Sequence, residues 1–140
     1  IFQTPGLIAI LQEQIHDTRF IYMDGRPHIP SSIKRWTGDS RGRWEGDTLV
    51  VETTNYDKHI DFFKFQVASE TLKVVERFKR IDQDNIDYTW TVHDPVTYTR
   101  SWSGTLPMRA EKGPMLEYAC HEGNYAVPNI LTGERANEKN

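Results

Sequence analysis

The sequence predicts an all-β domain, a single antiparallel meander that closes into a barrel. Three observations support this prediction. Short runs rich in β-branched and aromatic residues recur along the chain, Gly, Asp, Asn and Pro separate these runs, and no long stretch shows the 3.6-residue period of a helix. Consecutive hairpins suit a barrel because closure removes exposed sheet edges, and a β-sandwich is the alternative.

A single β-rich domain over residues 1–140 is expected from the length, which suffices for one hydrophobic core and is too short for two ordinary domains. A hydrophobic content of 37% and four tryptophans separate the chain from disordered proteins. The formal net charge of -3, with basic residues scattered among acids, disfavours nucleic acid as a partner. No run approaches the ~20 apolar residues of a membrane helix, so no membrane span is expected.

Four predicted hairpins account for roughly eight strands. The clearest turn signals are Glu45-Gly46-Asp47 and Asp82-Gln83-Asp84-Asn85, each between two apolar runs. The strand pairs are Leu7–Gln14 with Arg19–Met23, the two halves of "RWEGDTLVVETTNY", Leu72–Ile81 with Ile86–Asp94, and Tyr98–Ala110 with Met115–His121.

Two long segments interrupt this pattern. Residues 24–42 form a loop punctuated by proline and glycine, and loops of that length in a compact domain are usually functional or mobile. Residues 57–70 are expected to hold a short helix or a lid. The C-terminal tail, 126–140, has a few apolar anchors and then a polar end that is expected to fray.

Alternation in the strand near 72–78 places one carboxylate inside the domain. Side chains alternate between the two faces of a strand, so Glu76 shares its face with Leu72, Val74 and Phe78. This is the apolar face, which is the one expected to be buried. An unpaired buried charge costs several kcal/mol, so Glu76 is expected to have a partner or to face a wet cavity.

The following strands supply the surroundings expected for Glu76. Tyr88 and Trp90 fall on the inward face of the paired strand, and Arg100 and Trp102 share parity in the next one. We therefore expect Arg100 to meet Glu76 inside a cavity walled by aromatic rings, the form that small-molecule sites usually take. The alternative is a structural ion pair in the core.

The stretch "EYACHEGNY" holds the only cysteine beside a histidine and two carboxylates. On an extended strand, Tyr118 and Cys120 point to one side, whereas Glu117 and His121 point to the other. His121 could act as a general base whose tautomer a carboxylate sets, or it could be a solvated rim residue. Cys120 is expected to be a small core residue, because no basic surroundings would activate its thiol.

Two further clusters offer weaker candidates. "DGRPH" places His28 on the long loop, where it could cover the mouth of the cavity. "DKHID" sets Asp57, His59 and Asp61 at alternate positions, so that an extended segment could hold a divalent metal ion, although the spacing matches no established signature. The sequence has no P-loop, GxGxxG, GxSxG, HExxH or CxxCH motif, and no cofactor is expected.

Several polar motifs together resemble a large, mostly uncharacterised family of exported bacterial proteins. They are "IYMDGRPH", "GDSRGRWEGDTLVVETTNY", "VVERFKRIDQDNIDY" and "EYACHEGNY", in this order between Arg19 and Arg135. The resemblance implies export, which fits a chain that begins at Ile1 without methionine, and a secreted or periplasmic location is expected. It implies no catalytic residues. A looser likeness to lipocalins, which the predicted barrel resembles in outline, is limited to Gly42-Arg43-Trp44.

The expected function is therefore that of a β-barrel that binds a small, partly apolar molecule. The catalytic candidates are Glu76, Arg100 and His121, and the candidate ligand-binding residues are Tyr88, Trp90, Trp102, Tyr118 and His28. If the chain is an enzyme, acid–base chemistry such as hydrolysis, isomerisation or lyase action suits these groups best. The alternatives are a structural protein that assembles into a homo-oligomer or extracellular polymer, and a metal-dependent enzyme.

Overall fold

The computed structural model describes residues 1–57, 59, 69–119 and 122–138. Within these residues, eight strands form one sheet, in which each strand lies beside its neighbour in the sequence. A 3-10 helix η1 (Gln14–His16) joins the second strand to the third, and the α-helix α1 (Ala126–Asn137) follows the sheet. The strands are β1 (Phe2–Thr4), β2 (Leu7–Leu11), β3 (Thr18–Tyr22), β4 (Asp39–Glu45), β5 (Thr48–Thr54), β6 (Lys73–Arg80), β7 (Asn85–His93) and β8 (Trp102–Arg109). The all-β prediction is confirmed.

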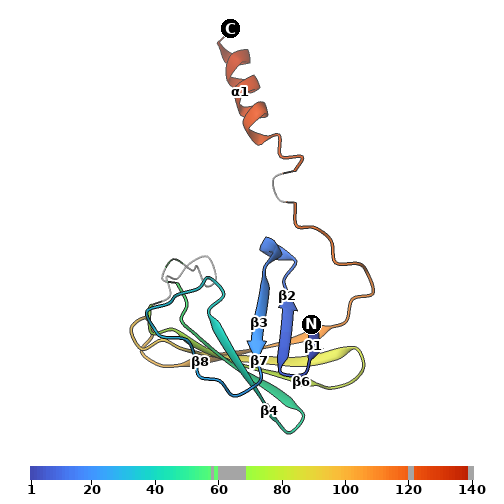
Figure 1. Cartoon of the computed structure of the whole chain (residues 1–140). Helices are drawn as coiled ribbons and strands as arrows, with labels where there is room; N and C mark the ends of the chain where they lie inside the picture. Colours follow the sequence, from blue (N-terminus) through green and yellow to red (C-terminus); the bar gives the residue numbers. More distant parts are fainter. Residues whose placement is uncertain (58, 60–68, 120–121, 139–140) are drawn as a thin grey trace.

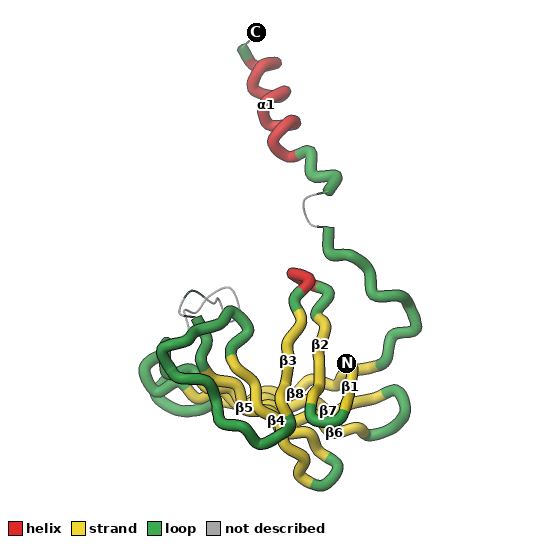
Figure 2. Tube along the Cα trace, viewed as in Figure 1, coloured by secondary structure: helices red, strands yellow, loops and turns green. Residues whose placement is uncertain are grey.

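The sheet curls into a half-barrel, with β2 and β3 standing up from β6, β7 and β8 (Figures 1 and 2). In a flat sheet, β3 and β6 would lie three strand spacings apart, about 14 Å. Arg19 on β3 nevertheless donates a hydrogen bond directly to Glu76 on β6. This contact requires the face that carries both residues to be concave, and we call it the inner face.

Two predicted hairpins are confirmed nearly to the residue. β4 and β5 pair around the turn at Gly46, which takes the positive φ of 62° that glycine adopts most easily. β6 and β7 pair over eight positions, from Lys73 with His93 to Arg80 with Ile86. Strong alternation and turn residues carried both predictions.

The pairing departs from the predicted antiparallel meander at one place. β3 and β4 run parallel and pair only through Ile21 with Ser40 and Tyr22 with Arg41. A parallel neighbour needs a crossover instead of a tight turn, and residues 23–38 provide it. The short strand β1, which was not among the predicted hairpins, pairs with β2 at one edge of the sheet.

The inner face carries two apolar clusters with a polar position between them. The first cluster consists of Ile8, Ile21, Leu49, Val51 and Phe78, and the second of Tyr56, Leu72, Val74 and Val92. On β6, Glu76 falls between Val74 of the second cluster and Phe78 of the first, and it is only 4% exposed. The predicted inward orientation of Glu76 is therefore correct.

The chain after β8 differs from the prediction. Residues 115–119 were expected to be in a strand, but they form none and lie in a segment that leaves the sheet (Figure 1). The connection at 111–114 does not reverse the chain, so the apolar alternation that follows has no strand to pair with. The tail forms the helix α1, which was not predicted: Pro128 lies in the first turn of α1, where proline is tolerated, and the Asn124 side chain accepts a hydrogen bond from the Ala126 amide at 3.0 Å. Among the described helices, none is long and apolar enough to cross a membrane.

Candidate functional site

The inner network consists of Arg19, Glu76 and Tyr88. The Arg19 guanidinium donates from Nη1 to Glu76 Oε1 at 3.1 Å and from Nη2 to Oε2, which makes a bidentate ion pair. The Tyr88 hydroxyl donates to Glu76 Oε1 at 2.8 Å. Both carboxylate oxygens of Glu76 are thus occupied, and β3, β6 and β7 are tied together by one residue.

Burial and charge fix the protonation states around Glu76. Burial alone would disfavour the charge of Arg19, but the adjacent Glu76 carboxylate raises the pKa of the guanidinium above its ordinary value. Burial, reinforced by the charge of Glu76, raises the pKa of Tyr88. A charged guanidinium and a neutral phenol therefore both act as donors, and Glu76 is their common acceptor.

Aromatic rings surround the inner network. Tyr88 stacks on Phe78 with the ring centroids 4.7 Å apart, and on Trp90 at 5.4 Å. Gly104 lies opposite Trp90 on β8, and a Cβ atom there would be 2.3 Å from the indole Cζ2. The missing side chain of Gly104 therefore makes room for the Trp90 ring. Trp102 packs against the second cluster, so the predicted inward positions of all three aromatic residues are correct.

Two buried donors on the inner face have no acceptor among the residues that the structure describes. They are Arg19 Nε and the indole Nε1 of Trp90. Buried N–H groups in folded proteins nearly always have a partner, because an unmade hydrogen bond in the interior costs about 1–3 kcal/mol. The inner face thus has unused capacity to bind an acceptor.

The predicted partner of Glu76 is wrong: it is Arg19, not Arg100. β8 begins at Trp102, and Arg100 lies exposed in the turn before it. The Asp94 carbonyl accepts a hydrogen bond from the Tyr98 amide at 2.8 Å, and this turn takes the place of the predicted strand start. Parity could have identified Arg19, which shares its face with Ile21, but the contact depends on the curl of the sheet.

The C-terminal candidates do not join the inner network. Tyr118 is 45% exposed and lies in the segment that leaves the sheet after β8. His121 and Cys120 lie outside the described residues, so their predicted roles stay predictions.

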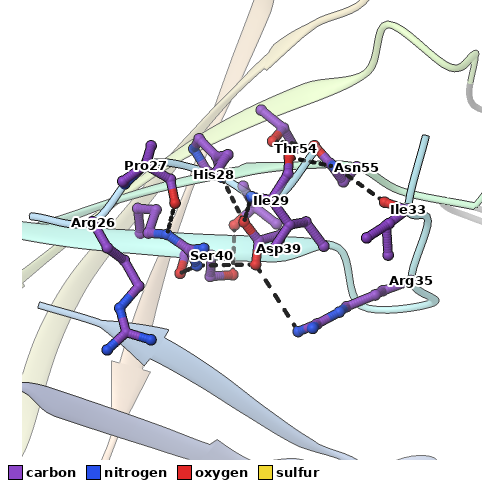
Figure 3. A network of polar contacts seen from close by, with 12 residues as sticks. Arg26, Pro27, His28, Ile29, Ile33, Arg35, Asp39, Ser40, Thr54 and Asn55 are labelled. Atoms are coloured by element: carbon purple, nitrogen blue, oxygen red, sulfur yellow. Dashed lines mark hydrogen bonds and ion pairs between the residues drawn. The ribbon is translucent and has the colours of Figure 1, made fainter. Parts of the chain in front are cut away.

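Figure 3 shows a second network of polar side chains, around Asp39 and the crossover. The register of β4 with β5 places it on the outer face of the sheet, opposite the inner network. Its centre is Asp39, which is 1% exposed. Asp39 Oδ2 lies 2.9 Å from His28 Nδ1, and Oδ1 accepts a hydrogen bond from Arg41 Nη1 at 2.9 Å. The other ring nitrogen of His28 lies 3.5 Å from Glu52 Oε1. We call these four residues the outer network.

The outer network anchors the 23–38 crossover. Burial alone would raise the pKa of Asp39, but hydrogen bonds from His28 and the Ile29 amide, together with the charge of Arg41, lower it below its ordinary value. Asn55, at a φ of 60°, adds hydrogen bonds from its Nδ2 to three carbonyl oxygens of the crossover.

The prediction that His28 covers the mouth of the inner site is wrong. The cross-strand pairs show why: Arg41 pairs with Glu52, whereas Gly42 pairs with Val51, which belongs to an inner-face cluster. Arg41 and Glu52 therefore face outward, and His28 lies beside them on the far side of the sheet from Glu76.

The metal alternative gains only a partial grouping. Asp57 Oδ1 lies 2.7 Å from Nδ1 of His59, and the histidine is exposed, whereas Asp61 lies outside the described residues. Within the described part of the chain, no three His, Cys, Asp or Glu side chains are grouped so that they could hold a metal ion.

Comparisons with known proteins give no match for this chain. No protein-family model, no curated protein and no solved structure matches the chain. The resemblance to exported bacterial proteins therefore stays a prediction, and any function has to be argued from the inner and outer networks themselves.

Proposed function

We propose that the inner face binds a small, partly apolar molecule that carries a hydrogen-bond acceptor. The observation that carries this proposal is the pair of buried donors, Arg19 Nε and Trp90 Nε1, which have no acceptor among the described residues. The stacked rings of Tyr88 and Trp90 would contact the apolar part of the molecule, and a carbonyl or ether oxygen would take the free donors.

Binding is better supported than catalysis. A general base needs a carboxylate oxygen within reach of the substrate proton, and both oxygens of Glu76 already accept hydrogen bonds from Arg19 and Tyr88. Acid–base turnover at Glu76 would require one of these bonds to break first. The arrangement instead suits Glu76 as the residue that positions its two donors.

A ligand-observed NMR screen of small carbonyl compounds with apolar groups tests this proposal. Trp90→Phe keeps an aromatic ring but removes the indole N–H, and we expect it to weaken binding of any hit about threefold to tenfold. Trp36→Phe is the matched control, because Trp36 is 64% exposed on the crossover. Hits that bind both variants as tightly as the wild type would contradict the proposal.

A second candidate function is self-assembly through the C-terminal arm, residues 110–119 and 122–138. Six of its large apolar side chains are more than half exposed; they are Met115, Leu116, Tyr125, Val127, Ile130 and Leu131. Such side chains usually mark an interaction surface. Removal of the chain after Arg109 should then lower the mass measured by light scattering to that of a monomer, whereas a full-length chain that is already monomeric excludes assembly.

We also propose a secreted or periplasmic location. The resemblance of residues 19–135 to a family of exported bacterial proteins supports this proposal. Fractionation of the source cells, followed by immunoblotting, tests it: the protein should accompany periplasmic or culture-medium markers. Recovery with the cytoplasmic markers would contradict it.

A further inference from the structure

The parallel pairing of β3 with β4 is a narrow seam in the sheet. It contains two residue pairs, whereas β2 and β3 pair over five positions and β4 and β5 over seven. The seam divides the half-barrel into a wall, which is β1 to β3, and a floor, which is β4 to β8. Figure 1 shows the wall standing up from the floor.

The crossover between wall and floor belongs mainly to the floor. The Met23 amide still donates to the Gly6 carbonyl of the wall at 3.0 Å. From Pro27 onward the crossover is bound to the floor, beginning with the hydrogen bond from Arg41 Nε to the Pro27 carbonyl at 3.0 Å. Residues 24–26 lie between these anchors, are exposed, and include Gly25 at a φ of 74°. This short stretch has the properties of a hinge.

Contacts on the inner face hold the wall against the floor. The Arg19–Glu76 ion pair spans from β3 to β6, and Ile8 and Ile21 of the wall belong to one apolar cluster with Leu49, Val51 and Phe78 of the floor. Ile21 also approaches Gly42 so closely that a Cβ atom there would be 2.7 Å from its Cγ2. Apart from the two seam pairs, side-chain contacts thus provide the closure.

We propose that the wall swings away from the floor as a unit, by parting of the β3–β4 seam about a hinge at residues 24–26. The Arg19–Glu76 ion pair holds the closed state and has to break before the wall can move. The movement opens the inner face. Its role as the entry route for a ligand rests on the function proposed above. β2 and β3 stay paired with each other throughout, as do β5, β6 and β7.

Amide hydrogen exchange on the unliganded, full-length protein tests the movement. In the wild type, the β3 and β4 amides that bond across the seam should exchange at least about tenfold faster than the amides of β6, and with a weaker dependence on denaturant, because parting of the seam releases them without global unfolding. Arg19→Met should widen this difference. Arg77→Met is the control, because Arg77 lies on the outer face of β6 in an exposed ion pair with Glu45. Equal protection of the seam amides and the β6 amides overturns the proposal.

Thiol labelling provides a second measurement, in which the Arg19–Glu76 ion pair stays intact. In a Cys120→Ser background, Ile21→Cys places a thiol at the seam and Val92→Cys places one on the floor, at sites 0% and 1% exposed. Iodoacetamide should label the seam thiol at least about tenfold faster under native conditions. Equal rates for the two thiols mean that only global unfolding exposes them, and they overturn the proposal.

The two proposals fail separately. Faster exchange of the seam amides, with no compound found to bind in the screen, would retain the hinge and remove the binding function. Conversely, saturable binding at Trp90, with the seam amides as protected as those of β6, would retain the binding function and remove the hinge.

Discussion

Glu76 is the residue on which the closed half-barrel depends. It is 4% exposed, and burial of a carboxylate is compensated only if its partners are well placed. Arg19 and Tyr88 fill that requirement from two other strands. Loss of either Arg19 or Glu76 alone leaves the charge of the other residue buried and unpaired. Loss of both residues removes both charges and leaves an apolar site.

A double-mutant cycle at Arg19 and Glu76 measures this dependence. We expect Glu76→Leu to lower the free energy of unfolding by about 3–5 kcal/mol, because it strands a buried guanidinium. The double variant Arg19→Met with Glu76→Leu should be more stable than the sum of the two single effects predicts. Urea denaturation gives the three values, and simple additivity would show that the two side chains do not interact.

Gly104 is the other residue with a specific task on the inner face. In Gly104→Ala, the new methyl group would meet the Trp90 ring at 2.3 Å, so the indole has to move. We expect a loss of about 1–3 kcal/mol in stability and a changed tryptophan fluorescence spectrum. Gly113→Ala is the matched control, since its Cβ would have no atom within 4 Å. If Gly104→Ala had the stability and the fluorescence spectrum of the wild type, the Trp90 ring would not lie over β8.

At the scale of single elements, Asp94 fixes the start of β6 against the end of β7. It is 2% exposed and accepts hydrogen bonds from the Ser69 hydroxyl, from the Ser69 amide at 3.0 Å and from the Thr71 hydroxyl at 3.0 Å. Burial opposes the charge, but these hydrogen bonds hold the pKa of Asp94 well below its usual 3.8. A depressed pKa stabilises the fold above the unfolded value and loses that contribution as the pH falls towards the folded value.

The melting temperature should therefore fall steeply as the pH drops below about 3.8. Asp94→Asn should lower the melting temperature at neutral pH, but should flatten its decline in acid, because asparagine does not titrate. Asp39, whose pKa is also lowered, retains part of the slope. Asp87→Asn, at an exposed position, is expected to keep the wild-type slope. Parallel acid curves for the wild type and Asp94→Asn would contradict the assignment.

The sequence pattern predicted those elements that depend on residues close together in the chain. Alternation and turn residues identified the β4–β5 and β6–β7 hairpins, and the same alternation placed Glu76, Tyr88 and Trp90 on the inner face. Arg19 was missed as the partner because its contact arises from the curl of the sheet, which no local pattern encodes. His28 was assigned to the wrong face for a related reason: the path of the crossover is set by its anchors, Asp39 above all.

At the scale of the whole molecule, the half-barrel leaves two edges open. Among the described residues, β1 and β8 each pair with a single neighbour, and Leu106 and Met108 of β8 are exposed. The C-terminal arm continues directly from this edge, and every residue of α1 is exposed. An isolated helix of 12 residues is marginal in water, so α1 should fray unless something packs against it.

Circular dichroism of the full-length chain against a chain ending at Arg109 tests this expectation. If the arm acts alone, the difference spectrum should show little helix at low concentration. A helical difference that grows with concentration indicates that copies of the chain pack against each other through the arm. Strong helicity at all concentrations would contradict the expectation that α1 needs a partner.

The most direct test of the inner face as a binding site is a nitrogen-15 NMR titration with any carbonyl compound that the screen identifies. A saturable shift of the Trp90 indole resonance, together with the backbone amides of Glu76 and Tyr88, is the predicted result, and the Trp36 indole should stay in place. Saturable binding that moves Trp36 or the residues around Asp39, and leaves Trp90 unchanged, would contradict the proposed site.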